Sequence, residues 1–260
     1  MNEIFIISLV QMKIFPGKVE KNVENALSLL EEAKREGSHM ALLPEMFSSG
    51  FYYNDLPGVA RETPAVITLF KKFCKREKIA IYFSAPELDQ GRVFNTAYII
   101  GETGRVRGKY RKVHLFGLFR EDRYFAGGEK LSTARVGTFQ ISPLICYDLR
   151  FPEVSRAGAV SGSHLITYCA QWPVARVQHW KSLLVARAIE NQLFVAAVNG
   201  TGTSGKIHLA GNSMVVSPTG EVILNGRKKE GCYTARLNKN LISDFRSKMN
   251  CLKDRKPEAY

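Results

Sequence analysis

Three reactive side chains each stand at the end of a stretch that is typical of a β-strand. Glu45 follows the apolar residues 40–43, Lys112 lies near the end of residues 106–113, and Cys146 ends the apolar residues 139–146. Ligands of α/β proteins bind in the crevice at the carboxyl ends of the strands. We therefore expect these three side chains to meet in one site.

A carboxylate, an amine and a thiol together supply the groups that amide hydrolysis requires. A cysteine nucleophile needs a base to accept its proton and a nearby cation to lower its pKa. A carboxylate can act as that base, and a lysine ammonium can also stabilise an oxyanion. Each residue taken singly is more often a capping carboxylate, a solvated lysine or an inert thiol. In combination, Glu45, Lys112 and Cys146 predict amide hydrolysis without a metal ion or another cofactor.

The elements that must position these residues alternate between strands and helices. This alternation predicts an α/β fold with helices on both faces of at least one sheet, and we find no internal repeat. We assign residues 1–238 to one domain and residues 239–260 to a C-terminal helix and basic tail, which packs on the domain or at an oligomer interface. One helix is expected to begin at Thr63-Pro64, because proline favours the first helical position. Further helices are expected at residues 18–35, 152–161, 174–191 and 239–249, and strands at 4–10, 40–43, 79–85, 94–100, 106–113, 139–146, 165–169, 193–198, 214–217, 222–224 and 232–237.

Composition places the chain among soluble globular proteins, since 45% of its 260 residues are hydrophobic and 23% are charged. Its apolar stretches fall far short of the roughly 18 residues that span a bilayer. The first ten residues lack the basic segment and the cleavage site of a secretory signal. Five cysteines without a CxxC pair predict reduced thiols rather than disulfides or a zinc site. We therefore expect a cytoplasmic protein that binds no metal.

The net charge of +13 raises the alternative of a basic nucleic-acid-binding protein. The excess is concentrated in residues 105–112 and near the C-terminus, and no recognised nucleic-acid motif accompanies it. A GxGxxG pattern at residues 200–205 is not followed by a helix that could receive a pyrophosphate. We therefore expect a small-molecule substrate, with neither a nucleic acid nor a membrane as partner.

Three longer strings around these residues resemble the nitrilase superfamily of carbon–nitrogen hydrolases. They are Leu-Pro-Glu-Met-Phe at residues 43–47, Cys-Tyr-Asp-Leu-Arg-Phe-Pro at 146–152 and Ala-Arg-Ala-Ile-Glu-Asn-Gln at 186–192. Trp172-Pro173, followed by Arg176 and His179-Trp180, makes the chain most similar to the omega-amidase branch. The resemblance implies a four-layer αββα sandwich, a homodimer or larger homo-oligomer, and no cofactor.

The same resemblance implies a role for four residues of this chain. Glu45 corresponds to the general base, Lys112 to the oxyanion stabiliser and Cys146 to the nucleophile of the family's Glu-Lys-Cys triad. Glu121 falls where the family has a second glutamate that orients the lysine and the substrate. The implied reaction forms a thioester and releases ammonia.

The omega-amidase branch hydrolyses the ω-amides of small α-keto acids, α-ketoglutaramate and α-ketosuccinamate. For such a substrate we expect Arg176 to bind the α-carboxylate and the backbone N–H of Tyr147 to assist the oxyanion. Trp172 and Phe51 are candidate aromatic walls. A carbamoyl-amide hydrolase or a generic aliphatic amidase that uses the same triad remains an alternative.

Overall fold

Two six-stranded β-sheets form the centre of the protein, whose structure is a computed structural model that describes residues 4–259. The first sheet has the strand order β14-β1-β2-β3-β4-β5, and the second has the order β13-β12-β9-β8-β7-β6. A separate two-stranded hairpin is formed by β10 and β11. The strands are β1 (Ile4–Gln11), β2 (Met40–Leu42), β3 (Ala80–Asp89), β4 (Arg92–Ile100), β5 (Val106–Arg111), β6 (Ala134–Val136), β7 (Phe139–Ile145), β8 (Leu165–Ala170), β9 (Phe194–Asn199), β10 (Thr201–Ser204), β11 (Ile207–Ala210), β12 (Met214–Val216), β13 (Val222–Asn225) and β14 (Gly231–Asn238).

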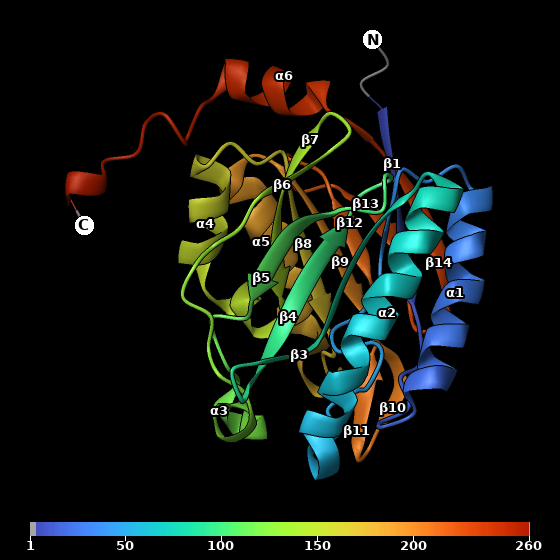
Figure 1. The fold of residues 1–260 in the computed structure, drawn as a ribbon. Coiled ribbons are helices and arrows are strands. Elements are labelled where there is room, and N and C mark those ends of the chain that lie inside the picture. Colours follow the sequence, from blue (N-terminus) through green and yellow to red (C-terminus); the bar gives the residue numbers. More distant parts are fainter. Residues whose placement is uncertain (1–3, 260) are drawn as a thin grey trace.

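Helices cover the outer face of each sheet. Figure 1 shows α1 and α2 beside the first sheet and α4 and α5 on the opposite side, beside the second sheet. The predicted four-layer αββα sandwich is therefore confirmed. The α-helices are α1 (Val19–Arg35), α2 (Leu56–Glu77), α3 (Glu121–Tyr124), α4 (Pro152–Val160), α5 (Val177–Asn191) and α6 (Asn240–Lys248), and 3-10 helices lie at Tyr53–Asp55, Gly117–Phe119, Cys146–Arg150, Val174–Arg176 and Pro257–Ala259.

The two sheets face each other across an apolar core. Phe5 of β1 stacks on Phe139 of β7, with ring centroids 4.7 Å apart. The buried hydroxyl of Tyr82 in β3 donates a hydrogen bond to the carbonyl of Leu144 in β7. Because each sheet also packs against helices, its central strands are buried on both faces, which explains their continuous apolar sequences.

The two sheets also share one topology, which was not predicted. In each sheet, three central strands run parallel in chain order, β1-β2-β3 in the first and β7-β8-β9 in the second. The strands that continue each sheet on either side pair in antiparallel fashion. The sequence Gly-Ser-His occurs at residues 37–39 before β2 and at 162–164 before β8. In both copies the histidine Nδ1 accepts a 2.9 Å hydrogen bond from a backbone N–H, that of Ile6 or of Gln140.

The predicted start of a helix at Thr63-Pro64 is wrong, because α2 begins seven residues earlier. The Asp55 side chain caps α2 by accepting a 2.9 Å hydrogen bond from the Gly58 N–H. Pro64 lies inside the helix and contributes no N–H to it. The buried Thr63 hydroxyl donates to the Pro86 carbonyl of β3, which ties this irregular turn to the sheet.

The C-terminal helix packs on the second half of the protein. The Arg246 guanidinium in α6 donates to the carbonyls of Gln192 and Asn191, at 3.2 and 3.3 Å, and Ile242 is buried. Beyond α6 the chain extends away from the sandwich (Figure 1). Within residues 4–259, no helix is both long and apolar enough to cross a membrane.

Candidate active site

Glu45, Lys112, Cys146 and Glu121 lie together at one end of the two sheets. Glu45 follows β2 and Lys112 follows β5, both in the first sheet, whereas Cys146 follows β7 in the second. The ammonium of Lys112 lies 2.8 Å from Glu45 Oε1 and 2.8 Å from Glu121 Oε2. The side chains of Glu45, Lys112 and Glu121 are at most 2% exposed. The stacking of the two sheets thus creates the cluster.

The surroundings of Lys112 favour the charged form of its buried ammonium group. Burial alone would lower the pKa of Lys112, but the carboxylates of Glu121 and Glu45 outweigh it and hold the pKa well above its ordinary value. Burial raises the pKa of Glu121, and the Lys112 ammonium opposes that rise. The backbone N–H of Phe116 also donates to Glu121 Oε2, at 3.1 Å. Lys112 is therefore a fixed cation beside the thiol.

Two further residues, absent from the candidates named above, fix the Glu45 carboxylate. The amide of Asn95 in β4 donates to Oε1 at 2.9 Å, and the backbone N–H of Gln171 donates to Oε2 at 3.1 Å. The side chain of Gln171 also donates to the Glu45 carbonyl, at 3.0 Å. With Lys112 on the same oxygen as Asn95, both oxygens of the Glu45 carboxylate accept hydrogen bonds from groups that fix its orientation.

Cys146 lies on a strained turn between β7 and a 3-10 helix. Its φ of +43° is a conformation that residues other than glycine rarely adopt. The fully buried carboxylate of Asp148 holds the turn, since Oδ2 accepts hydrogen bonds from the Ile145 N–H at 3.0 Å and from the Tyr110 hydroxyl at 2.8 Å. Its Oδ1 accepts from the His114 N–H at 3.2 Å and lies 2.8 Å from His114 Nδ1. The strain of the turn is thus offset by bonds to one carboxylate.

The surroundings of Cys146 raise the pKa of its thiol. Burial raises its pKa well above the ordinary range, and the Glu45 carboxylate raises it further. Lys112 lowers the pKa of this thiol, as predicted, but by less than burial raises it. A thiol whose pKa is raised needs a base to take its proton before it can act as a nucleophile, and the Glu45 carboxylate lies beside it.

A cavity opens at Cys146 and is lined mainly by aromatic side chains and two cations. Its volume of about 20 Å³ has room for roughly one water molecule. All four predicted substrate-binding residues line it. The lining residues are Glu45, Phe51, Phe116, Phe119, Glu121, Cys146, Tyr147, Arg150, Gln171, Trp172, Pro173 and Arg176.

The predicted binding residues take different positions around this cavity. The Arg176 guanidinium lies 5.5 Å from the centre of the Phe116 ring, and the Trp172 indole N–H donates to the Arg176 carbonyl at 2.7 Å. Arg150, which sequence reasoning missed, lies over the Trp172 ring at 4.8 Å. The backbone N–H of Tyr147 belongs to the first turn of the 3-10 helix, where N–H groups have no acceptor within the helix.

The part of the chain that the structure describes contains no group of three or more His, Cys, Asp and Glu side chains arranged to hold a metal ion. The acid–base groups of the cluster are instead two carboxylates, one ammonium and one thiol. This set can add a thiol to a carbonyl, stabilise the resulting oxyanion and transfer protons to a leaving amine.

The fold and this cluster define a hydrolase of carbon–nitrogen bonds. Residues 6–247 match the family model described as carbon-nitrogen hydrolase, and the chain belongs to that family, within the nitrilase superfamily. It is therefore an enzyme of the group that hydrolyses linear amides.

The chain is also similar to particular amidases and to solved structures of the superfamily. The chain is 33% identical to the 2-oxoglutaramate amidase of Bacillus subtilis, over 98% of both chains. A solved superfamily member from Xanthomonas campestris has a TM-score of 0.89 at 30% identity and covers 97% of each chain. A Nesterenkonia amidase variant, with a TM-score of 0.89 at 27% identity over 98% of this chain and 95% of its own, carries the acetamide moiety of fluoroacetamide on its active-site cysteine.

Proposed function

We propose that the protein is a cysteine-dependent omega-amidase, which releases ammonia from the ω-amide of short α-keto dicarboxylic acids. The observation that carries this proposal is the buried cluster of Glu45, Lys112, Glu121 and Cys146 beside a cavity with two arginines. The similarity to the 2-oxoglutaramate amidase of Bacillus subtilis supports this choice of substrate.

In the first half-reaction, the sulfur of Cys146 attacks the amide carbon while Glu45 accepts the thiol proton. Lys112 and the Tyr147 N–H stabilise the charge that develops on the amide oxygen, and losing one such donor typically costs about 10²–10³ in rate. Glu45 then gives its proton to the leaving nitrogen. The carbon–nitrogen bond breaks, ammonia departs, and a thioester on Cys146 remains.

In the second half-reaction, a water molecule enters the space that ammonia leaves. Glu45 removes a proton from this water as its oxygen attacks the thioester carbon, and Lys112 again faces the oxyanion. The carbon–sulfur bond breaks, the proton returns to Cys146, and the dicarboxylic acid is released. Glu121 positions Lys112 through both half-reactions, since it accepts the lysine's second short hydrogen bond.

The two arginines of the cavity account for the proposed preference for keto acids. Arg176 and Arg150 offer guanidinium groups to the α-carboxylate, and neither forms a salt bridge to a carboxylate within residues 4–259. An α-ammonium, as in glutamine, would meet two like charges and aromatic rings, since the two carboxylates of the cavity, Glu45 and Glu121, are already paired with Lys112. We expect kcat/KM for glutamine to be about 100-fold or more below that for α-ketoglutaramate, or about 2.7 kcal/mol.

Measuring ammonia release tests the proposal. The substrates compared are α-ketoglutaramate, α-ketosuccinamate, glutamine, asparagine and a carbamoyl amino acid. We expect turnover of the two keto-amides and slow turnover of the amino acids. Equal rates for glutamine and α-ketoglutaramate would exclude the keto-acid preference, and release of carbon dioxide with ammonia from the carbamoyl compound as the best substrate would establish a carbamoyl-amide hydrolase instead.

A further inference from the structure

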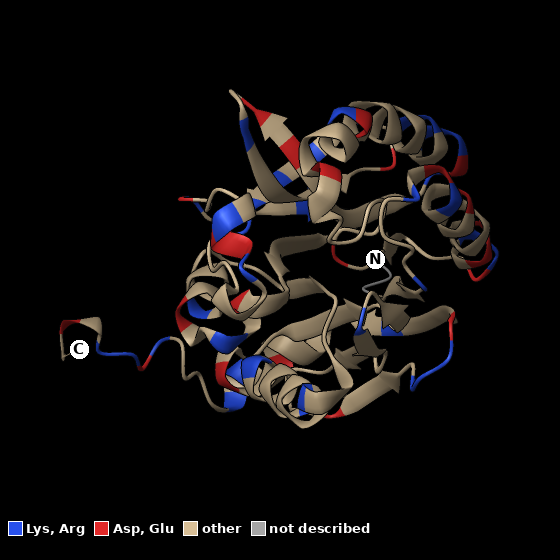
Figure 2. Cartoon of the chain, turned by 90° about the horizontal axis from the view of Figure 1, so that it is seen from below, with Lys and Arg blue, Asp and Glu red and all other residues tan. Residues whose placement is uncertain are grey.

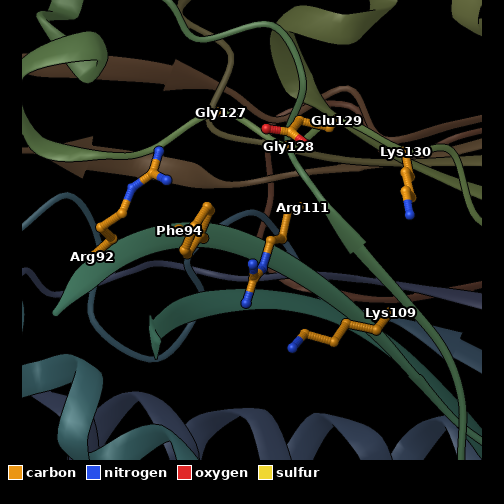
Figure 3. Close-up of a pocket in the computed structure, with 8 residues that line it drawn as sticks. All are labelled: Arg92, Phe94, Lys109, Arg111, Gly127, Gly128, Glu129 and Lys130. Atoms are coloured by element: carbon orange, nitrogen blue, oxygen red, sulfur yellow. The ribbon is translucent and has the colours of Figure 1, made fainter. Parts of the chain in front are cut away.

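A second, larger hollow lies on the outer face of the first sheet, apart from the Cys146 cavity. Its volume is about 470 Å³, within the range of small-molecule sites. It lies over the first residues of β4 and the last residues of β5, and under the loop of residues 127–130 (Figure 3). The lining residues are Arg92, Phe94, Lys109, Arg111, Gly127, Gly128, Glu129 and Lys130.

Four of the eight lining residues are cations and one is a carboxylate. They explain part of the basic run at residues 105–112, because strand alternation turns Lys109 and Arg111 outward while Tyr110 is buried. Figure 2 shows that elsewhere Lys and Arg are dispersed over many elements and interspersed with Asp and Glu. The hollow therefore gathers four cations and one carboxylate in a place that the amidase reaction does not use.

Two of the cations are fixed in place by carboxylates behind them. Glu87 pairs with Lys109 and, at 2.7 Å, with Arg111, whereas Asp89 also pairs with Arg111. Burial alone would raise the pKa of Glu87, but the hydrogen bonds from Arg111 and Lys109 lower it to about 2, so these pairs persist at neutral pH. They occupy Nε and Nη2 of Arg111, and Nη1 is left for another acceptor.

The other two cations, Arg92 and Lys130, are exposed and have no carboxylate within 4.0 Å among residues 4–259. The guanidinium groups of Arg92 and Arg111 lie over the Phe94 ring, at 5.3 and 3.8 Å from its centre (Figure 3). The aromatic ring thus holds two guanidinium groups beside the same hollow.

Glycine at position 128 brings the loop close to this face. A Cβ there would lie 2.1 Å from the Arg111 carbonyl oxygen, so no other residue fits without a backbone shift. The Gly128 N–H donates to the Lys112 carbonyl at 2.8 Å, which ties the loop to the end of β5. The hollow is therefore bounded by ordered backbone on this side as well as by side chains.

We propose that this hollow binds a small multivalent anion, one that carries two or more phosphate or carboxylate groups. Arg92, Arg111 and Lys130 contact the anion, and Lys109 contributes at longer range. Guanidinium groups bind both kinds of oxyanion through paired hydrogen bonds, so the shared chemistry is that of a compact polyanion. This binding is independent of the omega-amidase reaction.

Isothermal titration calorimetry on the full chain tests the proposal, with inorganic pyrophosphate and citrate as separate probes at near-physiological salt. We expect saturable binding of about one anion per chain for at least one probe. Binding of pyrophosphate alone identifies the ligand as a phosphate compound, and binding of citrate alone as a polycarboxylate. Absence of saturable binding with both probes would overturn the proposal.

A double variant and a matched control locate the binding. Arg92→Gln with Lys130→Gln should weaken binding about tenfold, since each charge contact at about 4 Å contributes a several-fold factor even in water. The control, Lys34→Gln with Lys248→Gln, removes the same charge from two exposed helix ends and should change binding by less than about twofold. If both double variants weakened anion binding equally, the anion would be attracted by the net charge of the protein alone, and the proposed site would be refuted. The double variant should lower the melting temperature by no more than about 4 °C, because neither side chain is in an ion pair among residues 4–259 and only the exposed contact of Arg92 with Phe94 is lost.

Discussion

Replacing Asp148 by asparagine should destabilise the turn at Cys146, although the two side chains have nearly the same size. The carboxylate is fully buried, and each of its two oxygens accepts from a backbone N–H, that of Ile145 on one side and that of His114 on the other. Asparagine has one oxygen and one NH₂ group. In either orientation, therefore, one of these backbone N–H groups faces another donor and remains unpaired in the protein interior.

The cost follows from that single unpaired group. Tyr110 can turn its hydroxyl and His114 can change its tautomer, but a backbone N–H cannot adapt. Leaving it unpaired costs about 2 kcal/mol, and this corresponds to a fall in melting temperature of about 4–8 °C for a domain of this size. The relaxed turn would also displace the Cys146 sulfur, and a misplacement of about 1 Å can reduce the rate about 100-fold.

Thermal unfolding followed by circular dichroism and ammonia release from α-ketoglutaramate measure the two effects. Asp244→Asn is the matched control, because Asp244 is exposed on α6 and the chemical change is identical. The control should melt within about 1 °C of the parent. If Asp148→Asn also melted within about 1 °C and kept its rate within about threefold, the argument that this carboxylate holds the turn would be refuted.

Three further predictions concern single residues. Cys146→Ala should reduce amide hydrolysis below about 1% of the parent rate and abolish the covalent acyl adduct seen by mass spectrometry, and residual turnover above that level would exclude it as nucleophile. Arg176→Lys should raise KM for α-ketoglutaramate and leave a simple aliphatic monoamide unaffected, and equal losses on both would make the role of Arg176 structural. The pKa of Glu87 is lowered from 4.5 to about 2, so its stabilisation is present above about pH 4.5 and lost as the pH falls toward 2. Glu87→Gln should therefore melt below the parent at pH 7 and at the same temperature as the parent near pH 2. A difference in melting temperature that stays the same from pH 7 to pH 2 would contradict this reasoning.

Glu45 and Cys146 were predictable because the ends of apolar strands are visible in the sequence, whereas Lys112 follows the mixed polar strand β5. An apolar run that stops at Glu45 or Cys146 identifies both the strand and the side chain at its end. The roles of Asn95 and Asp148 could not be predicted in this way. Each is a polar residue within a strand or a turn, and its hydrogen-bond partner is known only once the two sheets are stacked. The shared topology of the two sheets was also not predicted, because strand order is set by tertiary structure. Only the two Gly-Ser-His segments indicate this similarity in the sequence.

One local prediction was wrong and two short strands were not predicted, in places where tertiary contacts decide the structure. Pro64 was read as a helix start, but Asp55 supplies an earlier cap and the packing of α2 on the first sheet accommodates a proline inside the helix. No strand was predicted at β6 or β10, because three or four residues are too few for a periodic pattern to stand out in the sequence. Both are strands because a neighbouring strand pairs with them.

The strand order of the first sheet has a consequence for how the chain acquires its fold. β1 pairs on one side with β14, so that Gln11 lies opposite Gly231, and this pairing must wait until nearly the whole chain has been synthesised. Until then the edge of β1 is open to other chains. Such distant pairing also slows folding, because a long loop must close before the contact is made. Folding of the newly made chain should therefore depend on its last strand, and fragments that end before residue 231 should aggregate through β1.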